Sequence, residues 1–303
     1  MPFLPDWKGP GRQSGTRARR RCAGEARRGL DLRAGRPHGS SQLFVQGLSA
    51  LAASAIDPQH FASFDGTRIA YRELGEGRPV VLIHGYFSTA EVNWIKYGHA
   101  AAIAAKGFRV IMPDLRGHGS SDKPHDIAAY PPDALMRDGM ALLAHLGLTD
   151  YDLGGYSLGG RTTMRMLANG AAPRRAVIAG MGLTGIVSTA GRGGYFRNVL
   201  TNLGSFARGS VEWMTEAFLK TTGGDPVALL NVLETFVDTP IETVEAIAVP
   251  TLIVTGIEDD DNGSGAALAD ALPQAMFREI PGNHMSAVTK PELGQAIADF
   301  LSA

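Results

Sequence analysis

The sequence Gly154-Gly-Tyr-Ser-Leu-Gly-Gly160 contains the pattern Gly-x-Ser-x-Gly, with Ser157 at its centre. A short run typical of a strand, residues 151–153, precedes the pattern, and a segment with the composition of a helix, residues 161–169, follows it. A serine on so sharp a strand-to-helix turn has a strained backbone and an exposed hydroxyl. The residues two before and two after it lie too close to their neighbours to carry side chains. The two glycines of the pattern meet this requirement, so we predict a nucleophilic serine at the end of a strand.

Apolar runs that indicate strands alternate with helical segments on both sides of this turn. Val80–Ile83 and Phe108–Met112 are apolar throughout, which is typical of strands covered on both faces. The alternation predicts an α/β protein with a three-layer, mainly parallel sheet. The expected elements are a hairpin over 61–64 and 67–72, strands over 78–83, 108–112, 151–153, 174–179, 250–255 and 276–280, and helices over 91–106, 132–146, 161–169, 264–272 and 292–301.

The alternation is interrupted over residues 183–247, where no run resembles a buried strand. This segment opens with a glycine-rich stretch and continues with helical candidates over 197–203, 211–221 and 226–236. An insertion after a strand end lies where open α/β sheets bind ligands. We therefore expect a small helical cap over residues 183–247, inserted after the sixth strand, and a core made of residues 56–182 and 248–303.

Residues 1–55 differ in composition from the rest of the chain. Residues 1–42 carry ten Lys and Arg but three Asp and Glu and are rich in Gly, Pro and Ser, so we expect a basic, disordered extension. The end of this extension also resembles a signal-peptide cleavage region, which leaves export as the alternative to a cytoplasmic location. The single cysteine, Cys22, excludes an internal disulfide.

The composition of the remaining chain excludes two classes of partner. Residues 43–303 are acidic overall and offer no basic surface for nucleic acid. No apolar run reaches the ~18 residues that a membrane-spanning helix needs, so we expect no membrane partner. The sequence leaves a homodimer open.

A serine nucleophile needs a general base, and the base needs an acid that orients it. Two segments that follow strands supply both: Gly256–Asp259 ends in an acid, and Ile280–His284 ends in a base. The carboxyl ends of parallel strands share one edge of a sheet, so we expect both side chains to meet Ser157 there. Asp260 stays the alternative acid because carboxylates crowd this loop.

Together with two further motifs, these segments resemble the α/β-hydrolase superfamily over about residues 61–301. The further motifs are His84-Gly-Tyr86 after a buried strand and Asp114-Leu-Arg-Gly-His-Gly-Ser-Ser-Asp122. The resemblance implies Asp259 as the acid of a Ser-His-Asp triad. It also implies that His84 and residues 116–119 hold two loops in shape.

The resemblance further implies an oxyanion hole made of backbone N–H groups. These are the N–H of Leu158, directly after the nucleophile, and that of Tyr86, with Phe87 as the alternative to Tyr86. Two such donors, aimed at a developing oxyanion, typically contribute a few kcal/mol each to the lowering of the barrier. Neither position needs a particular side chain.

Serine in place of aspartate at the nucleophile position argues against epoxide hydrolases and haloalkane dehalogenases, and favours acyl chemistry. We expect a serine esterase for short to medium acyl chains, acting on a small-molecule ester without cofactor or metal. Lactone opening, carbon–carbon cleavage, amide cleavage and perhydrolysis use the same triad and stay open, as does a non-catalytic receptor. The expected substrate-binding residues are Phe87, Tyr156, Trp213 and Met285, and Arg192 and Arg197 are candidates for a substrate carboxylate.

Overall fold

The computed structural model describes residues 56–303. The extension expected over residues 1–55, with Cys22 and the signal-like segment, lies outside the described residues. None of the helices within the described part combines the length and the apolar character needed to span a membrane.

The strands and helices follow the expected alternation. The strands are β1 Gln59–Ala62, β2 Arg68–Leu74, β3 Arg78–Ile83, β4 Phe108–Pro113, β5 Asp152–Tyr156, β6 Ala176–Ala179, β7 Thr251–Gly256 and β8 Ala275–Ile280. The helices before β7 are η1 Glu91–Ile95, α2 His99–Ala104, η2 Ile127–Ala129, α3 Ala134–His145, α4 Leu158–Ala168, α5 Leu183–Val187, α6 Ala190–Thr201, α7 Val211–Thr221, α8 Pro226–Leu233 and α9 Ile241–Glu245. After β7 come α10 Gly265–Ala271, α11 His284–Ala287 and α12 Pro291–Ser302.

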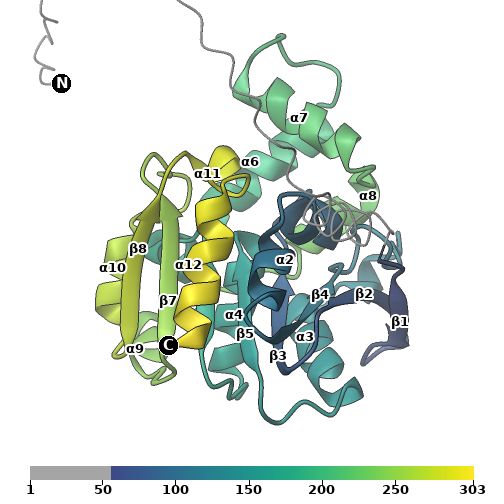
Figure 1. Cartoon of the computed structure of the whole chain (residues 1–303). Helices are drawn as coiled ribbons and strands as arrows, with labels where there is room; N and C mark the ends of the chain where they lie inside the picture. Colours follow the sequence, from purple (N-terminus) through teal and green to yellow (C-terminus); the bar gives the residue numbers. More distant parts are fainter. Residues whose placement is uncertain (1–55) are drawn as a thin grey trace, which may run out of the picture. The chain divides into compact units, whose positions relative to one another are not determined.

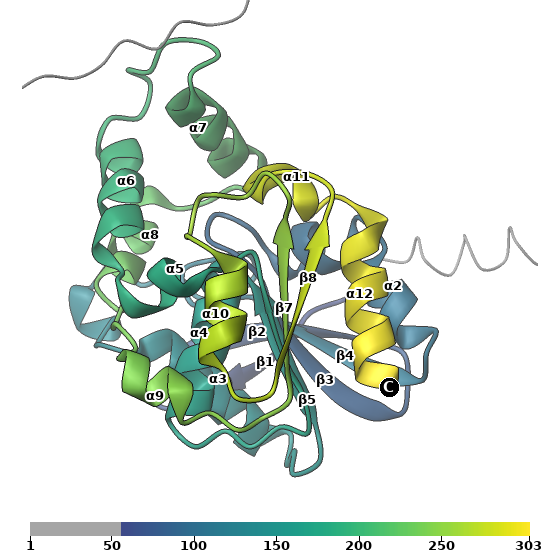
Figure 2. The same ribbon diagram turned by 90° about the vertical axis from the view of Figure 1, so that its left-hand side faces the viewer.

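The strands form one sheet in the order β1-β2-β4-β3-β5-β6-β7-β8. Strand β2 is antiparallel to β1 and to β4, and all other neighbouring pairs are parallel. The expected mainly parallel sheet is therefore confirmed. The carboxyl ends of the parallel strands share one edge, and Figure 2 shows β7 and β8 pointing toward α11 at this edge.

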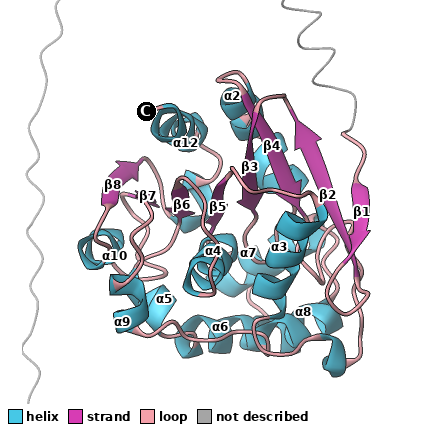
Figure 3. Ribbon diagram, turned by 90° about the horizontal axis from the view of Figure 1, so that it is seen from below, coloured by secondary structure: helices cyan, strands magenta, loops and turns pink. Residues whose placement is uncertain are grey.

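Helices cover both faces of the sheet, which confirms the three layers. Figure 3 shows α2 and α12 on one face, and α3, α4 and α10 on the other. The apolar run in β3 serves both layers because successive strand side chains point to opposite faces. Val80 and Leu82 pack with α2 and α12, and Val81 and Ile83 pack toward α3.

Helices α5 to α9 lie between β6 and β7, and we call residues 183–247 the helical insertion. Figure 1 shows α6, α7 and α8 beyond the edge of the sheet where the parallel strands end. The Tyr86 hydroxyl donates a 2.6 Å hydrogen bond to the Leu229 carbonyl and so joins the loop after β3 to α8.

Two expected elements differ in the structure. The helix expected over 91–106 is divided into η1 and α2 because Gly98 lies between them with φ +79°, a left-handed conformation that ends a helix. The glycine-rich stretch 191–194 belongs to α6 and does not precede the helix. Buried Val199 and Leu200 hold α6 in the apolar core, and such packing outweighs the poor helix propensity of glycine.

Candidate active site

Ser157 stands on the turn between β5 and α4, with φ 55° and ψ −115°. Only two other non-glycine residues within 56–303 have positive φ, so the serine backbone is strained. A Cβ at Gly155 would overlap the backbone of Gly159, and a Cβ at Gly159 would overlap the carbonyl of Ile83. The Ser157 N–H donates to the Ala179 carbonyl at 2.7 Å, which holds the turn against β6. Close backbone approach is thus the reason for both glycines of the pattern.

The structure brings together the three side chains that the sequence singled out. The distance from His284 Nε2 to Ser157 Oγ is 2.9 Å, and that from His284 Nδ1 to Asp259 Oδ2 is 3.0 Å. The side chains of His284 and Asp259 are 8% and 2% exposed. Asp260 is exposed and makes no hydrogen bond with the histidine. The serine hydroxyl can therefore donate to one ring nitrogen while the other donates to a buried carboxylate.

Hydrogen bonds to the backbone around His284 hold this residue in place. It is the first residue of α11, and the Asn283 side chain accepts the N–H groups of Met285 and Ser286 at the start of this helix. The Tyr156 hydroxyl donates to the His284 carbonyl at 2.6 Å. Helix α11 could not be predicted from the sequence because a helix of four residues has no periodic pattern.

The loop after β3 passes directly beside the serine. A Cβ at Gly85 would lie 3.3 Å from the Ser157 Cβ, a tight contact, so glycine suits a loop that approaches the serine this closely. Tyr86 and Phe87 follow, with stacked rings 4.5 Å apart. Leu158 is the first residue of α4, where backbone N–H groups have no acceptor within the helix. The loop after β3 and the start of α4 thus both lie next to the serine.

His84 fastens this loop to the one after β4. Its Nδ1 donates to the Gly85 carbonyl at 2.8 Å, and its Nε2 accepts from the Leu115 N–H at 2.9 Å. Burial lowers the pKa of His84, so the ring is neutral and can both donate and accept. Asp114 accepts the N–H groups of Ala90 and Ser120 and ties the same two loops together.

A cavity of about 110 Å³ opens beside the serine. Two of the residues predicted to bind substrate, Phe87 and Met285, line this cavity. Arg192 also lines it and forms a 2.7 Å ion pair with Asp261. The further lining residues are Tyr86, Ser157, Tyr195, Phe196, Val211, Thr215, Phe218, Asp261 and His284.

Two of the expected substrate-binding residues lie elsewhere, and the structure corrects both. Tyr156 is the last residue of β5, and its ring packs against Gly180 and does not line the cavity. Trp213 lies on α7 but does not line the cavity. Arg197, a candidate for a substrate carboxylate, instead pairs with Glu234 at 2.5 Å.

The segment from residue 78 to residue 186 matches the family model described as the alpha/beta hydrolase fold. The chain belongs to the α/β-hydrolase superfamily. Its sequence is similar to a non-heme haloperoxidase of Rhodococcus erythropolis, with 37% identity over 121 residues, which cover 38% of this chain and 41% of that protein. The match to this curated relative thus spans less than half of its length.

Solved structures match this α/β-hydrolase over most of the chain. A bromoperoxidase from Bacillus anthracis superposes with a TM-score of 0.63 at 25% identity, over 82% of this chain and 100% of that chain. An esterase from Rhodococcus sp. ECU1013 superposes with a TM-score of 0.62 at 25% identity, over 81% and 98% of the two chains. The similarity includes proteins named for different reactions.

Sequence reasoning missed the residues of this α/β-hydrolase that reach the cavity from α7. These are Val211, Thr215 and Phe218, which recur at the spacing of one helix face. Trp213, two positions after the first of them, is turned roughly 200° around the helix. The spacing of the three residues was the signal that could have found them.

Ligand atoms of Asp259, Asp261 and His284 lie within 4.8 Å of one another, a spacing at which a cation could bind. A cation there would compete for the Nδ1 atom that already pairs with Asp259. The hydrogen bonds to Ser157 and Asp259 already account for both ring nitrogens of His284, and Asp261 pairs with Arg192.

Proposed function

We propose that this α/β-hydrolase cleaves carboxylic esters through an acyl-enzyme formed on Ser157. The observation that carries the proposal is the 2.9 Å contact from Ser157 Oγ to His284 Nε2, with Asp259 on the other ring nitrogen. In this arrangement His284 takes the hydroxyl proton as the serine attacks the ester carbonyl. Asp259 keeps the ring in the tautomer that can accept the proton, and stabilises the imidazolium that forms.

The tetrahedral intermediate needs hydrogen-bond donors for its oxyanion. We assign these donors to the backbone N–H groups of Leu158 and Tyr86. The close approach of Gly85 to Ser157 supports Tyr86 over Phe87, since the residue after Gly85 is the first to pass the nucleophile. The intermediate collapses when protonated His284 gives its proton to the leaving alcohol. A water activated by the same histidine then hydrolyses the acyl-enzyme.

The cavity supports short to medium acyl chains. Its volume of about 110 Å³ is well below the range of roughly 300–1,000 Å³ for sites that hold drug-sized ligands. Rings from the helical insertion, including Tyr195 and Phe218, form its apolar wall. A long acyl chain would have to displace these rings.

Perhydrolysis is the second candidate because the relatives include proteins named haloperoxidase and bromoperoxidase. An acyl-enzyme can be attacked by hydrogen peroxide in place of water, which forms a peracid and regenerates the serine. This reaction needs no group beyond those that ester hydrolysis uses. Peracid formation from acetate and peroxide, absent in Ser157→Ala, would establish it.

The test of the leading proposal is hydrolysis of a p-nitrophenyl ester series from acetate to decanoate, beside Ser157→Ala. We expect the highest kcat/KM at short or medium chains and a loss of roughly ten-thousandfold or more in the variant. A folded protein without turnover would contradict the proposal and direct the search to lactones, carbon–carbon substrates and a non-catalytic receptor, in that order. A rate that rises steadily through decanoate would contradict the chain-length assignment.

A further inference from the structure

Arg161 lies one helical turn after the nucleophile, on the same face of α4. Its backbone N–H donates to the Ser157 carbonyl at 3.0 Å. Side chains of a helix lean toward its N-terminus, so the Arg161 side chain covers the turn that begins with the serine. The position brings a cation close to the reacting group.

The charge of Arg161 has no partner within the described residues. The residue is 6% exposed, its Nη1 atom makes no hydrogen bond, and no carboxylate of residues 56–303 forms an ion pair with it. Burial lowers the pKa of Arg161 to about 10, against a smaller opposing effect of the Asp238 carboxylate, which forms no ion pair with it; the guanidinium is still charged at neutral pH. Buried charges in proteins are normally paired, because an unpaired one costs several kcal/mol of desolvation.

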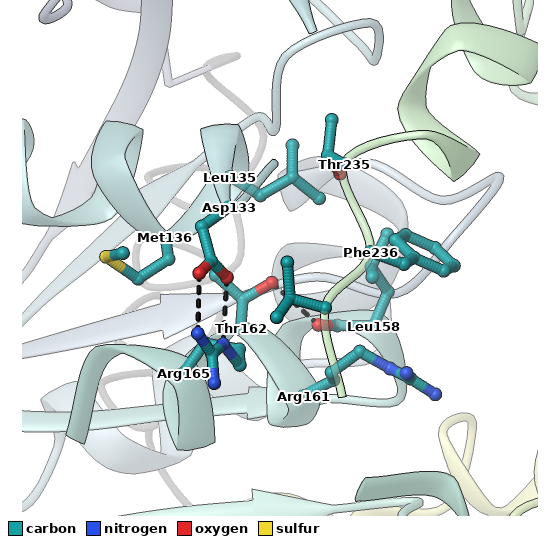
Figure 4. Close-up of a pocket in the computed structure, with 10 residues that line it drawn as sticks. Asp133, Leu135, Met136, Leu158, Arg161, Thr162, Arg165, Thr235 and Phe236 are labelled. Atoms are coloured by element: carbon teal, nitrogen blue, oxygen red, sulfur yellow. Dashed lines mark hydrogen bonds and ion pairs between the residues drawn. The ribbon is translucent and has the colours of Figure 1, made fainter. Parts of the chain in front are cut away.

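The neighbouring arginines show what a paired site in this protein looks like. Arg165, one turn further along α4, makes a bidentate pair with Asp133, and buried Arg116 pairs with Asp65 and Asp138. Figure 4 shows the Arg161 side chain extending away from the Asp133–Arg165 pair. It lies against Phe236 instead, with the guanidinium 5.3 Å from the ring centroid. Arg161 is thus the exception that needs an explanation.

A small side cavity connects Arg161 to the nucleophile. It has a volume of about 20 Å³ and is lined by Ser157, Leu158, Arg161, Met181, Phe236 and Asn262. It shares Ser157 with the main cavity, so the serine lies where the two meet. A volume of this size holds one group little larger than a water molecule. Arg192 also borders both cavities, but Asp261 already neutralises its charge.

We propose that Arg161 binds a carboxylate of the substrate, so that the preferred ester is a half-ester of a short dicarboxylic acid. This inference rests on the proposed ester hydrolysis and names its substrate class. A planar guanidinium binds a carboxylate with two parallel hydrogen bonds, which is the partner that this buried cation lacks. Ser157 and Arg161 line the same small side cavity, which has room for little more than the carboxylate itself. The methylene groups would then lie at Ser157, where the two cavities meet, so the two carboxyl carbons can be only a few methylene groups apart, as in succinate and glutarate.

The first test compares charged and neutral esters of matched length. The substrates are monomethyl glutarate and methyl valerate, and the readout is methanol release. We expect the wild-type protein to prefer the half-ester, and the ratio of the two kcat/KM values to fall about tenfold to a hundredfold in Arg161→Met. Arg161→Lys should retain part of the preference. An unchanged ratio in Arg161→Met would overturn the proposal.

Arg165→Met is the matched control. It removes a positive charge from the same helix, but that charge is already paired with Asp133. The ratio of the two substrates should stay at the wild-type value in this variant. A fall as large as that in Arg161→Met would mean that the general loss of positive charge, and not a carboxylate site, sets the preference.

The second test measures binding without catalysis. Calorimetric titration of the Ser157→Ala variant with glutarate should give saturable binding. The double variant Ser157→Ala/Arg161→Met should show none. If no ester is cleaved but glutarate binding depends on Arg161, the carboxylate site stands and the proposed ester hydrolysis fails. Equal glutarate binding by the single and the double variant would overturn the carboxylate site. So would a loss of glutarate binding in sodium chloride at the same concentration as glutarate, because the site would then bind any anion.

Discussion

The hydroxyl of Tyr156 donates a 2.6 Å hydrogen bond to the backbone carbonyl of His284, 128 residues further along the chain. Burial raises the pKa of Tyr156 well above its ordinary value, so the hydroxyl keeps its proton and remains a donor. The residue directly before Ser157 therefore holds the segment that carries the histidine. Tyr156 connects two parts of the site and does not line the cavity.

Replacing this donor tests the connection. We expect Tyr156→Phe to lower kcat for p-nitrophenyl butyrate about tenfold with little change in KM, since the histidine segment loses one anchor while the cavity keeps its walls. The free energy of unfolding in urea should fall by about 1 kcal/mol. A raised KM with unchanged kcat would instead assign the ring to substrate binding.

Neutralising the carboxylate beside the histidine should abolish most of the activity. We expect Asp259→Asn to lower kcat by roughly ten-thousandfold, because an amide favours the wrong tautomer of His284. Asp260→Asn is the control, since that exposed side chain makes no bond with the histidine. Its kcat should stay within about twofold of the wild type. If Asp260→Asn were the inactive variant, the two assignments would have to be exchanged.

The contribution of α7 to the cavity wall can be tested by enlarging the cavity. Phe218→Ala removes a ring from the cavity wall, and we expect the best p-nitrophenyl ester to become longer by several carbon atoms. Trp213→Ala, a change of similar size on the same helix, lies outside the cavity lining. It should leave the chain-length profile where it was, and a shift in both variants would point to movement of the whole helix.

The turn at the nucleophile should not accept a methyl group. Because a Cβ at Gly159 would overlap the Ile83 carbonyl, Gly159→Ala should destabilise the fold by several kcal/mol or prevent folding. Gly194→Ala is the opposite case, since this glycine lies in α6 with nothing within 4 Å of an added Cβ. The control should raise the free energy of unfolding by up to about 1 kcal/mol. Equal effects in urea unfolding would contradict the steric argument.

Buried His118 makes stability depend on pH. Burial, with His84 nearby, lowers the pKa of His118 to about 3, so the folded state stays neutral while the unfolded chain takes up a proton below about pH 6.5. The effect of His118 on the free energy of unfolding is therefore absent above that pH and becomes increasingly destabilising as the pH falls toward 3. We expect this effect to lower the free energy of unfolding by about 2 kcal/mol when the pH falls from about 8 to about 5.

His118→Asn separates this effect from a general loss of stability. The shorter amide can replace the Nδ1 donor to the Arg116 carbonyl but does not titrate. Urea unfolding at both pH values should show a smaller pH-dependent loss in the variant, with the rest coming from groups such as buried His84 and His99. The same loss in both proteins would exclude His118 as its source.

The strands and the nucleophile turn could be predicted because their causes are local. Runs such as Val80–Ile83 are apolar throughout only if both faces of a strand are covered, and the structure confirms that layering. The break at Gly98 and the extension of α6 through residues 191–194 could not be predicted. At Gly98 the left-handed backbone conformation ended a helix that the surrounding residues favour. In α6 the packing of the helix outweighed the poor helix propensity of its glycines.

The sequence by itself determined the order of strands and helices, the turn at Ser157, and the placement of an acid and a base after two later strands. These features depend on residue types at fixed spacing, and parallel strands bring their ends to one edge. Only the tertiary structure decided that Asp259 meets His284, that Trp213 lies outside the cavity, and that no carboxylate among residues 56–303 pairs with Arg161. Such contacts join residues far apart in the chain or depend on how a helix is rotated. Their geometry is therefore set by packing and not by local pattern.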